Sequence, residues 1–299
     1  MKDENEIVRN SLTKRRAMNI LKYSALIVFT IIVLFPIFWT VMTSLKPQAE
    51  WFTFPPIWIT KNPTLLNYEL AVFGTGPKVL GWRGRPFSSI WVPLANSMFV
   101  SGISTLLCVL VGLLAAYSIS RYGTGGSSFL TSIVMPRMFP PMAMIIPIMV
   151  FYRMIGALDT YWGLIIAYTA FTLPFSVLMI KGFIDAVPKE LEEAAKLDGL
   201  SPLQILWKVT VPLVKSGLMT TALFLFILNW TEYVFVLTLA SRGVNVITIA
   251  LAKLFMGEEG TFYGVQSALG ILAAIPTIIF GLLIHRYLAF GFTFGAIKK

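Results

Sequence analysis

Long apolar segments dominate this sequence and constrain its fold more than any other feature. A helix needs about 20 apolar residues to cross the hydrocarbon core of a membrane. The chain of 299 residues is 57% hydrophobic and only 13% charged, whereas soluble domains average about 25% charged residues. We therefore predict an all-α integral membrane protein, with a transmembrane domain over 23–290 between an N-terminal segment, 1–22, and a C-terminal tail, 291–299. Six segments are predicted to be transmembrane helices: 23–44, 92–119, 129–152, 161–184, 213–239 and 264–288.

The distribution of positive charge predicts the orientation of these helices. The net charge is +10, and most Lys and Arg residues lie at the ends of apolar segments that share one side. By the positive-inside rule this side is the cytoplasm, so the predicted orientation is N-in and C-in. The polar connector 185–212, between the fourth and fifth spans, is then cytoplasmic. No nucleic-acid-binding motif accompanies the basic residues, so membrane lipid is the expected partner and nucleic acid is not.

Residues suited to catalysis or metal binding are scarce. The chain has one cysteine, Cys108, and one histidine, His285. A single cysteine excludes disulfides and thiolate metal sites within the chain, and the scarce acids leave no convincing catalytic set. The sequence also lacks a Gly-rich loop ending in Gly-Lys-Ser/Thr, the motif that cradles nucleotide phosphates. We predict a non-catalytic membrane subunit with no metal site and no cofactor of its own.

The connector 185–212 is charged and well capped, unlike the apolar segments on either side of it. Pro188 suits the first turn of a helix, and the glutamates that follow lie near the positive end of the helix dipole. Gly199 can end this helix in a left-handed conformation, and Ser201 with Gln204 forms a capping box for a second helix. We predict two short helices joined at Gly199. Such an element, held between two spans, is suited to presenting a surface to a partner.

The same connector carries the spacing of a known motif. Glu193-Ala194-Ala195, Gly199 and then Val209-x-Val211-Pro212 resemble the EAA loop of ABC importer permeases. The chain as a whole resembles the carbohydrate-uptake class of these permeases, and in particular the smaller permease subunit of maltose transporters. Further matching pieces are Ser44-Leu45-Lys46-Pro47, Asn96-Ser97, Ala115 to Arg121, Phe139-Pro140, Asn229 to Tyr233 and Arg286 to Lys298.

The resemblance implies a binding-protein-dependent ABC importer in a bacterial or archaeal cytoplasmic membrane. An extracytoplasmic substrate-binding protein delivers a sugar, oligosaccharide or polyol to a pathway formed by this chain and a second, homologous permease. An ATPase dimer binds ATP and Mg and docks on the loop from the cytoplasm. The residues that the resemblance implies for this coupling are Glu190, Glu193, Ala194, Ala195, Asp198, Gly199 and Pro212. The two alanines would allow close approach of the ATPase, and Glu193 suits an arginine on it.

Polar residues near the outer end of the fifth span are candidates for the substrate pathway, because intramembrane charges are costly. Asn229, Glu232 and Tyr233 would bond sugar hydroxyls, and Trp230 would stack on a sugar face. Packing between subunits is the alternative role. The chain departs here from many members of the family, which have Trp-Asn-Glu-Phe at this place.

Other features of the spans and loops leave alternatives open. Pro136, Pro140, Pro141 and Pro147 are expected to break the third span, either to line a pathway or as a packing kink. Arg137, in the same span, is expected to pair with another helix or subunit, and Asn96 and Ser97 to hydrogen-bond between helices. The aromatic outer loop 45–90 suits either the membrane interface or contact with an external protein.

A proton-coupled secondary transporter is the alternative function. It would need a relay of intramembrane carboxylates and no ATPase. Glu232 is the one clear intramembrane acid in the sequence, which argues against such a relay.

Overall fold

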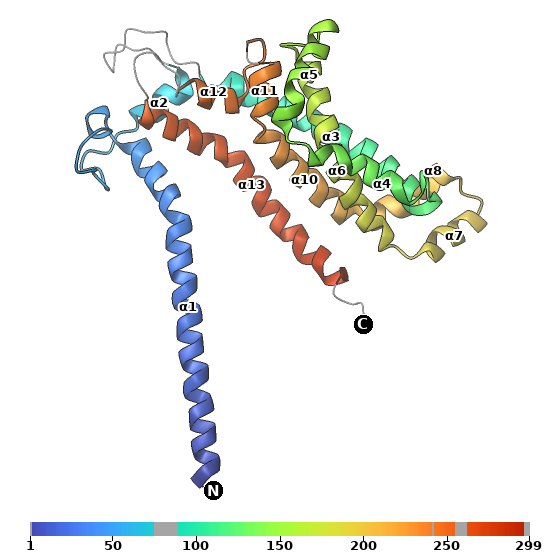
Figure 1. Cartoon of the computed structure of the whole chain (residues 1–299), viewed down its shortest axis with the longest axis horizontal. Helices are drawn as coiled ribbons and strands as arrows, with labels where there is room; N and C mark the ends of the chain where they lie inside the picture. Colours follow the sequence, from blue (N-terminus) through green and yellow to red (C-terminus); the bar gives the residue numbers. More distant parts are fainter. Residues whose placement is uncertain (1, 75–88, 241, 255–261, 296–299) are drawn as a thin grey trace.

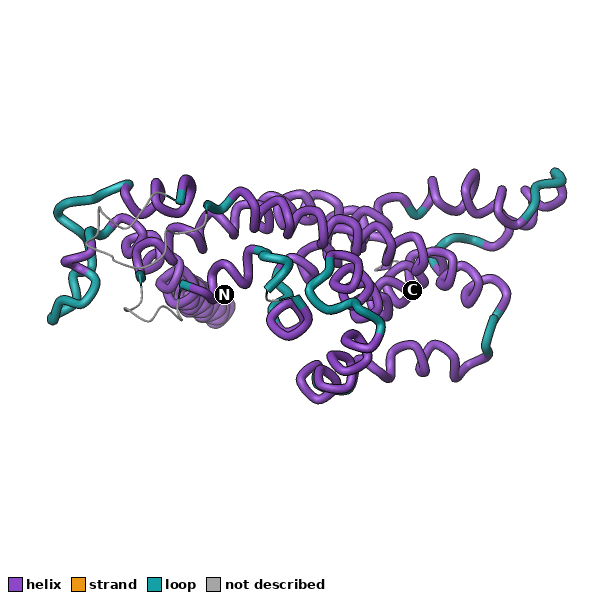
Figure 2. The backbone as a smooth tube through the Cα atoms, turned by 90° about the horizontal axis from the view of Figure 1, so that it is seen from above, coloured by secondary structure: helices purple, strands orange, loops and turns teal. Residues whose placement is uncertain are grey.

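The computed structural model of the protein describes residues 2–74, 89–240, 242–254 and 262–295. Within these ranges all side chains are described except those of 2–14, 16–17, 127, 137–138, 141 and 284–295, so the side chains of Arg137 and His285 lie outside the described set. The described residues form helices and loops and contain no strand, as the prediction of an all-α protein requires (Figure 2).

Four of the predicted spans are single long helices. By length and composition each has an apolar part that can cross a membrane, over Met18–Leu45, Trp91–Tyr122, Tyr161–Asp185 and Tyr263–Leu283. The helices that contain these parts are α1 (Lys2–Leu45), α3 (Trp91–Tyr122), α6 (Tyr161–Asp185) and α13 (Tyr263–Gly295). Helix α1 therefore runs back through most of the predicted N-terminal segment, and α13 extends into the predicted C-terminal tail.

The third predicted span is broken, as its prolines indicated. It consists of α4 (Gly126–Val134), a 3-10 turn η3 (Met135–Met138) and α5 (Pro141–Met154). Pro136, Pro140 and Pro141 have no N–H to donate to a preceding carbonyl, so a continuous helix cannot form across this point. Pro147 lies inside α5.

The fifth predicted span differs from the expected single helix over 213–239. The chain turns by 80° between Pro202–Leu213 and Lys215–Trp230, and it breaks again at 231–233. The elements are α8 (Pro202–Ile205), a π-helical turn η4 (Leu206–Thr210), α9 (Val211–Leu213), α10 (Lys215–Trp230) and α11 (Val234–Leu239).

Helices α3 and α6 form the centre of the bundle, and α10 packs against both of them and against α13 (Figure 1). A glycine permits the close approach of the central pair, because a Cβ built on Gly112 of α3 would lie 2.2 Å from Oγ of Ser176 in α6. The predicted interhelical hydrogen bonds are confirmed. Asn96 Oδ1 accepts the hydroxyl of Tyr161 at the start of α6 (2.9 Å), and Ser97 Oγ accepts the N–H of Ile247 (2.9 Å) at the start of α12 (Ile247–Lys253). Asn96 Nδ2 also donates to the carbonyl of Asn245 in the loop before α12 (2.8 Å).

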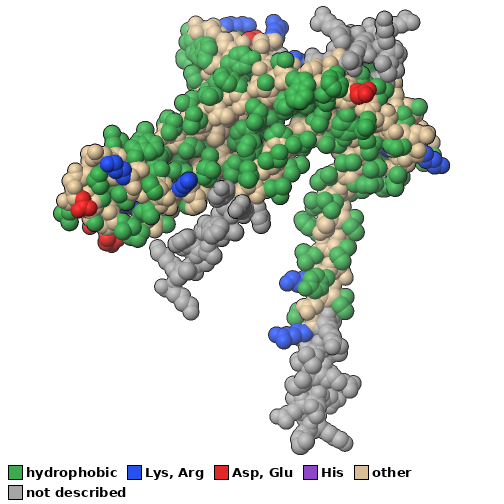
Figure 3. All heavy atoms as spheres, turned by 180° about the vertical axis from the view of Figure 1, so that it is seen from behind, with side chains coloured by type: hydrophobic (Ala, Val, Ile, Leu, Met, Phe, Trp, Pro, Cys, Tyr) green, Lys and Arg blue, Asp and Glu red, His purple; other side chains and the backbone are tan. Residues whose placement is uncertain are grey.

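Helix α1 projects away from this bundle (Figure 1). Its end nearest the outer loop contacts α13 and α2 (Leu66–Phe73). The most apolar stretch of its span, which we call its apolar window, has no buried residue. Hydrophobic side chains cover the bundle and α1 over much of the face seen in Figure 3, and charged side chains lie mostly toward the ends. Such a surface is suited to lipid or to another apolar subunit rather than to water.

Hydrogen bonds order the first part of the outer loop 45–90, of which the structure describes 45–74 and 89–90. Asn67 Nδ2 donates to the carbonyls of Ser44 and Lys46 (2.9 Å each), and the Trp51 indole donates to the Lys46 carbonyl (3.1 Å). A short 3-10 turn, η1 (Gln48–Glu50), lies between them. Both roles considered for this loop, interfacial and protein-binding, stay predictions.

Candidate functional site

The connector after α6 folds into two short helices joined at Gly199, as predicted. Helix α7 (Lys189–Leu197) follows Pro188, which occupies the N-cap position. It ends at Gly199 in the left-handed region (φ 84°), where Leu200 N–H donates to the Ala195 carbonyl (3.2 Å). The predicted capping box is present at the start of α8, with Gln204 Oε1 accepting the N–H of Ser201 (2.9 Å).

Helix α7 has one face buried against the rest of the chain and one exposed face. Glu192 and Ala195 are buried against the rest of the chain. The opposite face carries Glu190, Glu193, Ala194 and Leu197, which are exposed and recur at three- and four-residue spacing. We call these four residues the outer stripe. Of the two motif alanines, only Ala194 is therefore open to a partner.

The outer stripe is unusual for a polar helix because it ends in an exposed leucine. Leu197 is 90% exposed, and Leu203 of α8 and Trp207 of η4 add further exposed apolar side chains nearby in the chain. These side chains are available for apolar contact with a partner. The two other predicted coupling residues, Asp198 at the C-cap of α7 and Pro212 in α9, are also exposed.

The buried face of α7 contains an ion pair that the sequence did not predict. Arg121 Nε, in the last turn of α3, lies 3.0 Å from Oε1 of Glu192. The carboxylate also accepts hydrogen bonds from the hydroxyls of Thr210 (2.8 Å) and Tyr117 (3.3 Å). The only signal available in the sequence was that Arg121 ends the piece Ala115 to Arg121 that carries part of the family resemblance.

Two of the predicted pathway residues are packing residues within this chain. Asn229 is 2% exposed, and its Nδ2 donates to Thr105 Oγ1 of α3 (3.2 Å). Trp230 is 4% exposed, stacks on Phe226 and donates through Nε1 to the Ala273 carbonyl of α13 (3.1 Å). Neither side chain is available to a substrate in this arrangement.

The other two pathway candidates lie at the break between α10 and α11 and are half-buried. Glu232 Oε1 accepts the N–H groups of Val234 (2.9 Å) and Phe235 (3.2 Å), which are orphan donors at the start of α11. Its backbone carbonyl accepts the hydroxyl of Thr248 (3.0 Å). Glu232 thus stabilises the break, and Glu232 and Tyr233 keep some open surface there.

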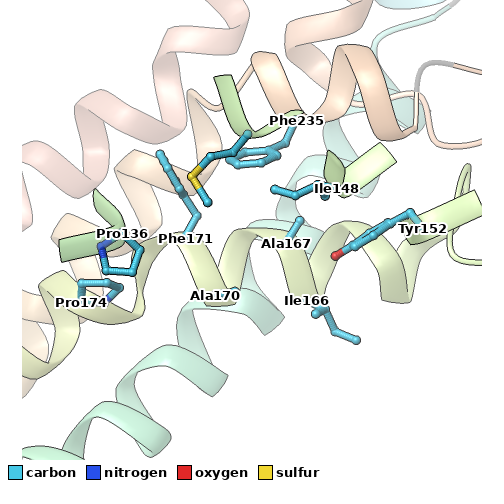
Figure 4. Close-up of a pocket in the computed structure, with 10 residues that line it drawn as sticks. Pro136, Ile148, Tyr152, Ile166, Ala167, Ala170, Phe171, Pro174 and Phe235 are labelled. Atoms are coloured by element: carbon cyan, nitrogen blue, oxygen red, sulfur yellow. The ribbon is translucent and has the colours of Figure 1, made fainter. Parts of the chain in front are cut away.

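An apolar cavity of about 360 Å³ lies between α5, α6 and α11 (Figure 4). Tyr152 is the one lining residue with a polar side chain, and its hydroxyl donates to the Gly163 carbonyl (3.1 Å). A sugar needs several convergent polar groups, so the cavity is not built to bind one. The lining residues are Pro136, Met144, Ile148, Tyr152, Ile166, Ala167, Ala170, Phe171, Pro174 and Phe235.

Metal binding finds no support in the described part of the chain. Its His, Cys, Asp and Glu residues form no group of three or more that could hold an ion.

Comparison with known proteins identifies the family of the chain. Residues 108–293 match the model of the binding-protein-dependent transport system inner membrane component. The inner membrane ABC transporter permease YcjP of Escherichia coli K12 is 33% identical over 287 residues, covering 95% of this chain and 98% of the relative. The trehalose transport system permease SugB of Mycobacterium tuberculosis is 34% identical over 271 residues, covering 89% and 92%.

The fold is also that of a solved transporter. A chain in the crystal structure of a bacterial ABC transporter that imports the acidic polysaccharide alginate superposes with a TM-score of 0.73 at 22% identity, over 91% of this chain and 96% of that one. Together with the apolar helices, these similarities show that this chain is a multi-pass member of the family of binding-protein-dependent transport system inner membrane components.

Proposed function

We propose that the chain is a permease subunit of an ATP-driven importer for a sugar, oligosaccharide or polyol. The observation that carries this proposal is the similarity to a trehalose transport permease over 89% of the chain. A relative in Agrobacterium fabrum, named for sulfoquinovosyl glycerol transport, is 30% identical and covers 89% of the chain. The membrane is the cytoplasmic membrane of a bacterium or archaeon, with the N-in and C-in orientation that the positive charges favour.

The outer stripe of α7 is the proposed docking surface for the ATPase. Glu190 and Glu193 offer carboxylates to basic groups of the partner, Ala194 permits close approach, and Leu197 supplies apolar contact. ATP and Mg bind to the ATPase dimer. Closure of that dimer then moves α7, a rigid-body form of coupling.

A second, homologous permease completes the membrane pathway in this proposal. The exposure of the whole apolar window of α1 supports a further subunit, because this helix packs on its own chain at one end only. An extracytoplasmic binding protein delivers the substrate. Glu232 and Tyr233, beside the break between α10 and α11, are the substrate contacts we propose.

The alternative of a proton-coupled transporter is less well supported. A relay needs carboxylates free to exchange protons. Glu232 is instead engaged by two backbone N–H groups at the start of α11.

A pull-down with the co-expressed ATPase tests the docking proposal. The variant Glu193→Lys/Ala194→Trp changes two exposed residues of the outer stripe and leaves the buried face of α7 intact. We expect it to reach the membrane normally and to lose the ATPase. Glu69→Lys, the same charge reversal at an exposed residue of α2, is the control and should retain the ATPase. Equal ATPase recovery by both variants would contradict the proposed surface.

A further inference from the structure

The buried ion pair of Arg121 and Glu192 attaches α7 to the transmembrane bundle. The two side chains are 7% and 10% exposed. Removing two charges from water is costly unless further polar groups satisfy them. Here the additional partners come from the end of α6 and the turn after it, from η4, and from α3 itself. The cluster is therefore a buried link between helices rather than a surface contact.

Each group of the pair contacts a different part of the bundle. Arg121 Nη2 donates to the carbonyls of Ile184 and Val187 (3.0 Å each), at the end of α6. Glu192 accepts from Tyr117 of α3 and from Thr210 at the end of η4. The cluster therefore joins α3, α6, α7 and the segment that leads into α10.

Helix α7 is connected to α6 through the short turn 186–188 and to α8 through Gly199, whose surroundings are open. It also packs against α8 and η4. A force on the outer stripe would rotate α7 about its two backbone connections, the turn 186–188 and Gly199. With the cluster in place, the same force reaches α3 directly and reaches α10 through Thr210.

We infer that Arg121 and Glu192 are positioning residues for energy coupling, which transmit displacement of α7 to α3 and α10. The inference rests on the proposed function of the outer stripe. The two adjacent glutamates then have different roles. Glu193 faces outward to the ATPase, and Glu192 faces inward to Arg121.

The double variant Arg121→Met/Glu192→Met tests this inference. Apolar residues of similar volume often replace a buried ion pair without loss of folding, because no unpaired charge remains. The neighbouring pair Lys181 and Asp185 of α6, which is more exposed, provides the control as Lys181→Met/Asp185→Asn. Asn is chosen because Asp185 also accepts a hydrogen bond from Ser120 of α3, and an amide oxygen can still accept it. Each variant is assembled with the second permease, the ATPase and the binding protein in lipid vesicles. The measured quantity is the sugar imported per ATP hydrolysed.

We expect the double variant to bind the ATPase and hydrolyse ATP as the wild type does, but to import at least about fivefold less sugar per ATP, the lower range of allosteric coupling. The control pair should give the wild-type ratio. A wild-type ratio in the double variant would overturn the inference. Failure of the wild-type chain to bind the ATPase would instead count against the proposed function.

A second variant covers the case in which the double variant fails to assemble. Arg121→Gln/Glu192→Gln removes both charges, so that no unpaired charge remains, and keeps a polar group at each position for the neighbouring hydrogen bonds. We expect the sugar imported per ATP to fall while ATPase binding is retained. An unchanged ratio would show that the ion pair has no part in coupling.

Discussion

Glu192 and Glu193 show how neighbouring identical residues differ in energetic role. The first is buried opposite Arg121 and accepts hydrogen bonds from two hydroxyls, whereas the second is exposed on the outer stripe. Removal of one member of a buried ion pair leaves the other charge without compensation. An exposed carboxylate remains solvated and contributes little to stability.

Alanine substitution should therefore destabilise the protein strongly at Glu192 and hardly at all at Glu193. We expect Glu192→Ala to lower the free energy of unfolding by about 3 kcal/mol or more, because the Arg121 guanidinium loses its carboxylate. Glu193→Ala should change it by less than about 0.5 kcal/mol. Thermal unfolding of the two purified variants in detergent measures the difference, and equal stabilities would contradict the assignment of faces.

A second residue-scale prediction concerns the break between α10 and α11. Glu232→Ala removes the acceptor for two backbone N–H groups and should destabilise the protein by about 1 kcal/mol, as for other helix caps. Glu232→Gln keeps an acceptor and should be close to the wild type in stability. If Glu232 also contacts sugar, the Gln variant will nonetheless transport more slowly. If the Glu232→Gln variant takes up sugar at the wild-type rate, Glu232 caps α11 and does not contact the substrate.

At the residue scale, the sequence predicted which residues form turns and caps, but not toward which neighbours the side chains point. The turn at Gly199 and the capping box at Ser201 depend on adjacent residues, so they could be predicted. The inward direction of Glu192 depends on Arg121, which belongs to another helix far away in the chain. The burial of Asn229 and Trp230 likewise depends on α3 and α13, which no local pattern places.

At the scale of elements, the close contact of α3 with α6 organises the bundle. Gly112 permits it, because a Cβ there would meet both Oγ (2.2 Å) and Cβ (2.7 Å) of Ser176. Gly102 of the same helix has open space around its Cβ position. The two glycines therefore offer a matched pair for measuring the contribution of this contact.

We expect Gly112→Ala to destabilise the protein by about 1–3 kcal/mol, the usual cost of overpacking. Gly102→Ala should be neutral or stabilising by up to about 1 kcal/mol, because alanine favours a helix over glycine. Thermal unfolding of both variants under one set of conditions provides the comparison. Equal effects would mean that α3 and α6 do not approach as closely as described.

The elements that could be predicted are those with a strong local cause. Apolar length predicted α1, α3, α6 and α13, and proline predicted the break between α4 and α5. The break at 231–233 was missed, whereas the 80° turn before α10 falls at the predicted start of the fifth span. No proline or glycine occurs at 231–233, and the break is stabilised by Glu232 and by Thr248, which lies further along the chain.

At the scale of the whole molecule, the chain has surfaces that its own fold leaves uncovered. The apolar window of α1 is unburied, and the outer stripe of α7 faces away from the bundle. Resemblance to the family predicted the partners for these surfaces, and the comparisons show the family to which the chain belongs.

Uptake of trehalose or another oligosaccharide into lipid vesicles that contain the assembled transporter tests the importer function most directly. We expect accumulation that requires ATP, the ATPase and the binding protein, and that a pH gradient cannot drive in their place. Accumulation driven by a pH gradient in vesicles without the ATPase would contradict it and would favour a proton-coupled transporter.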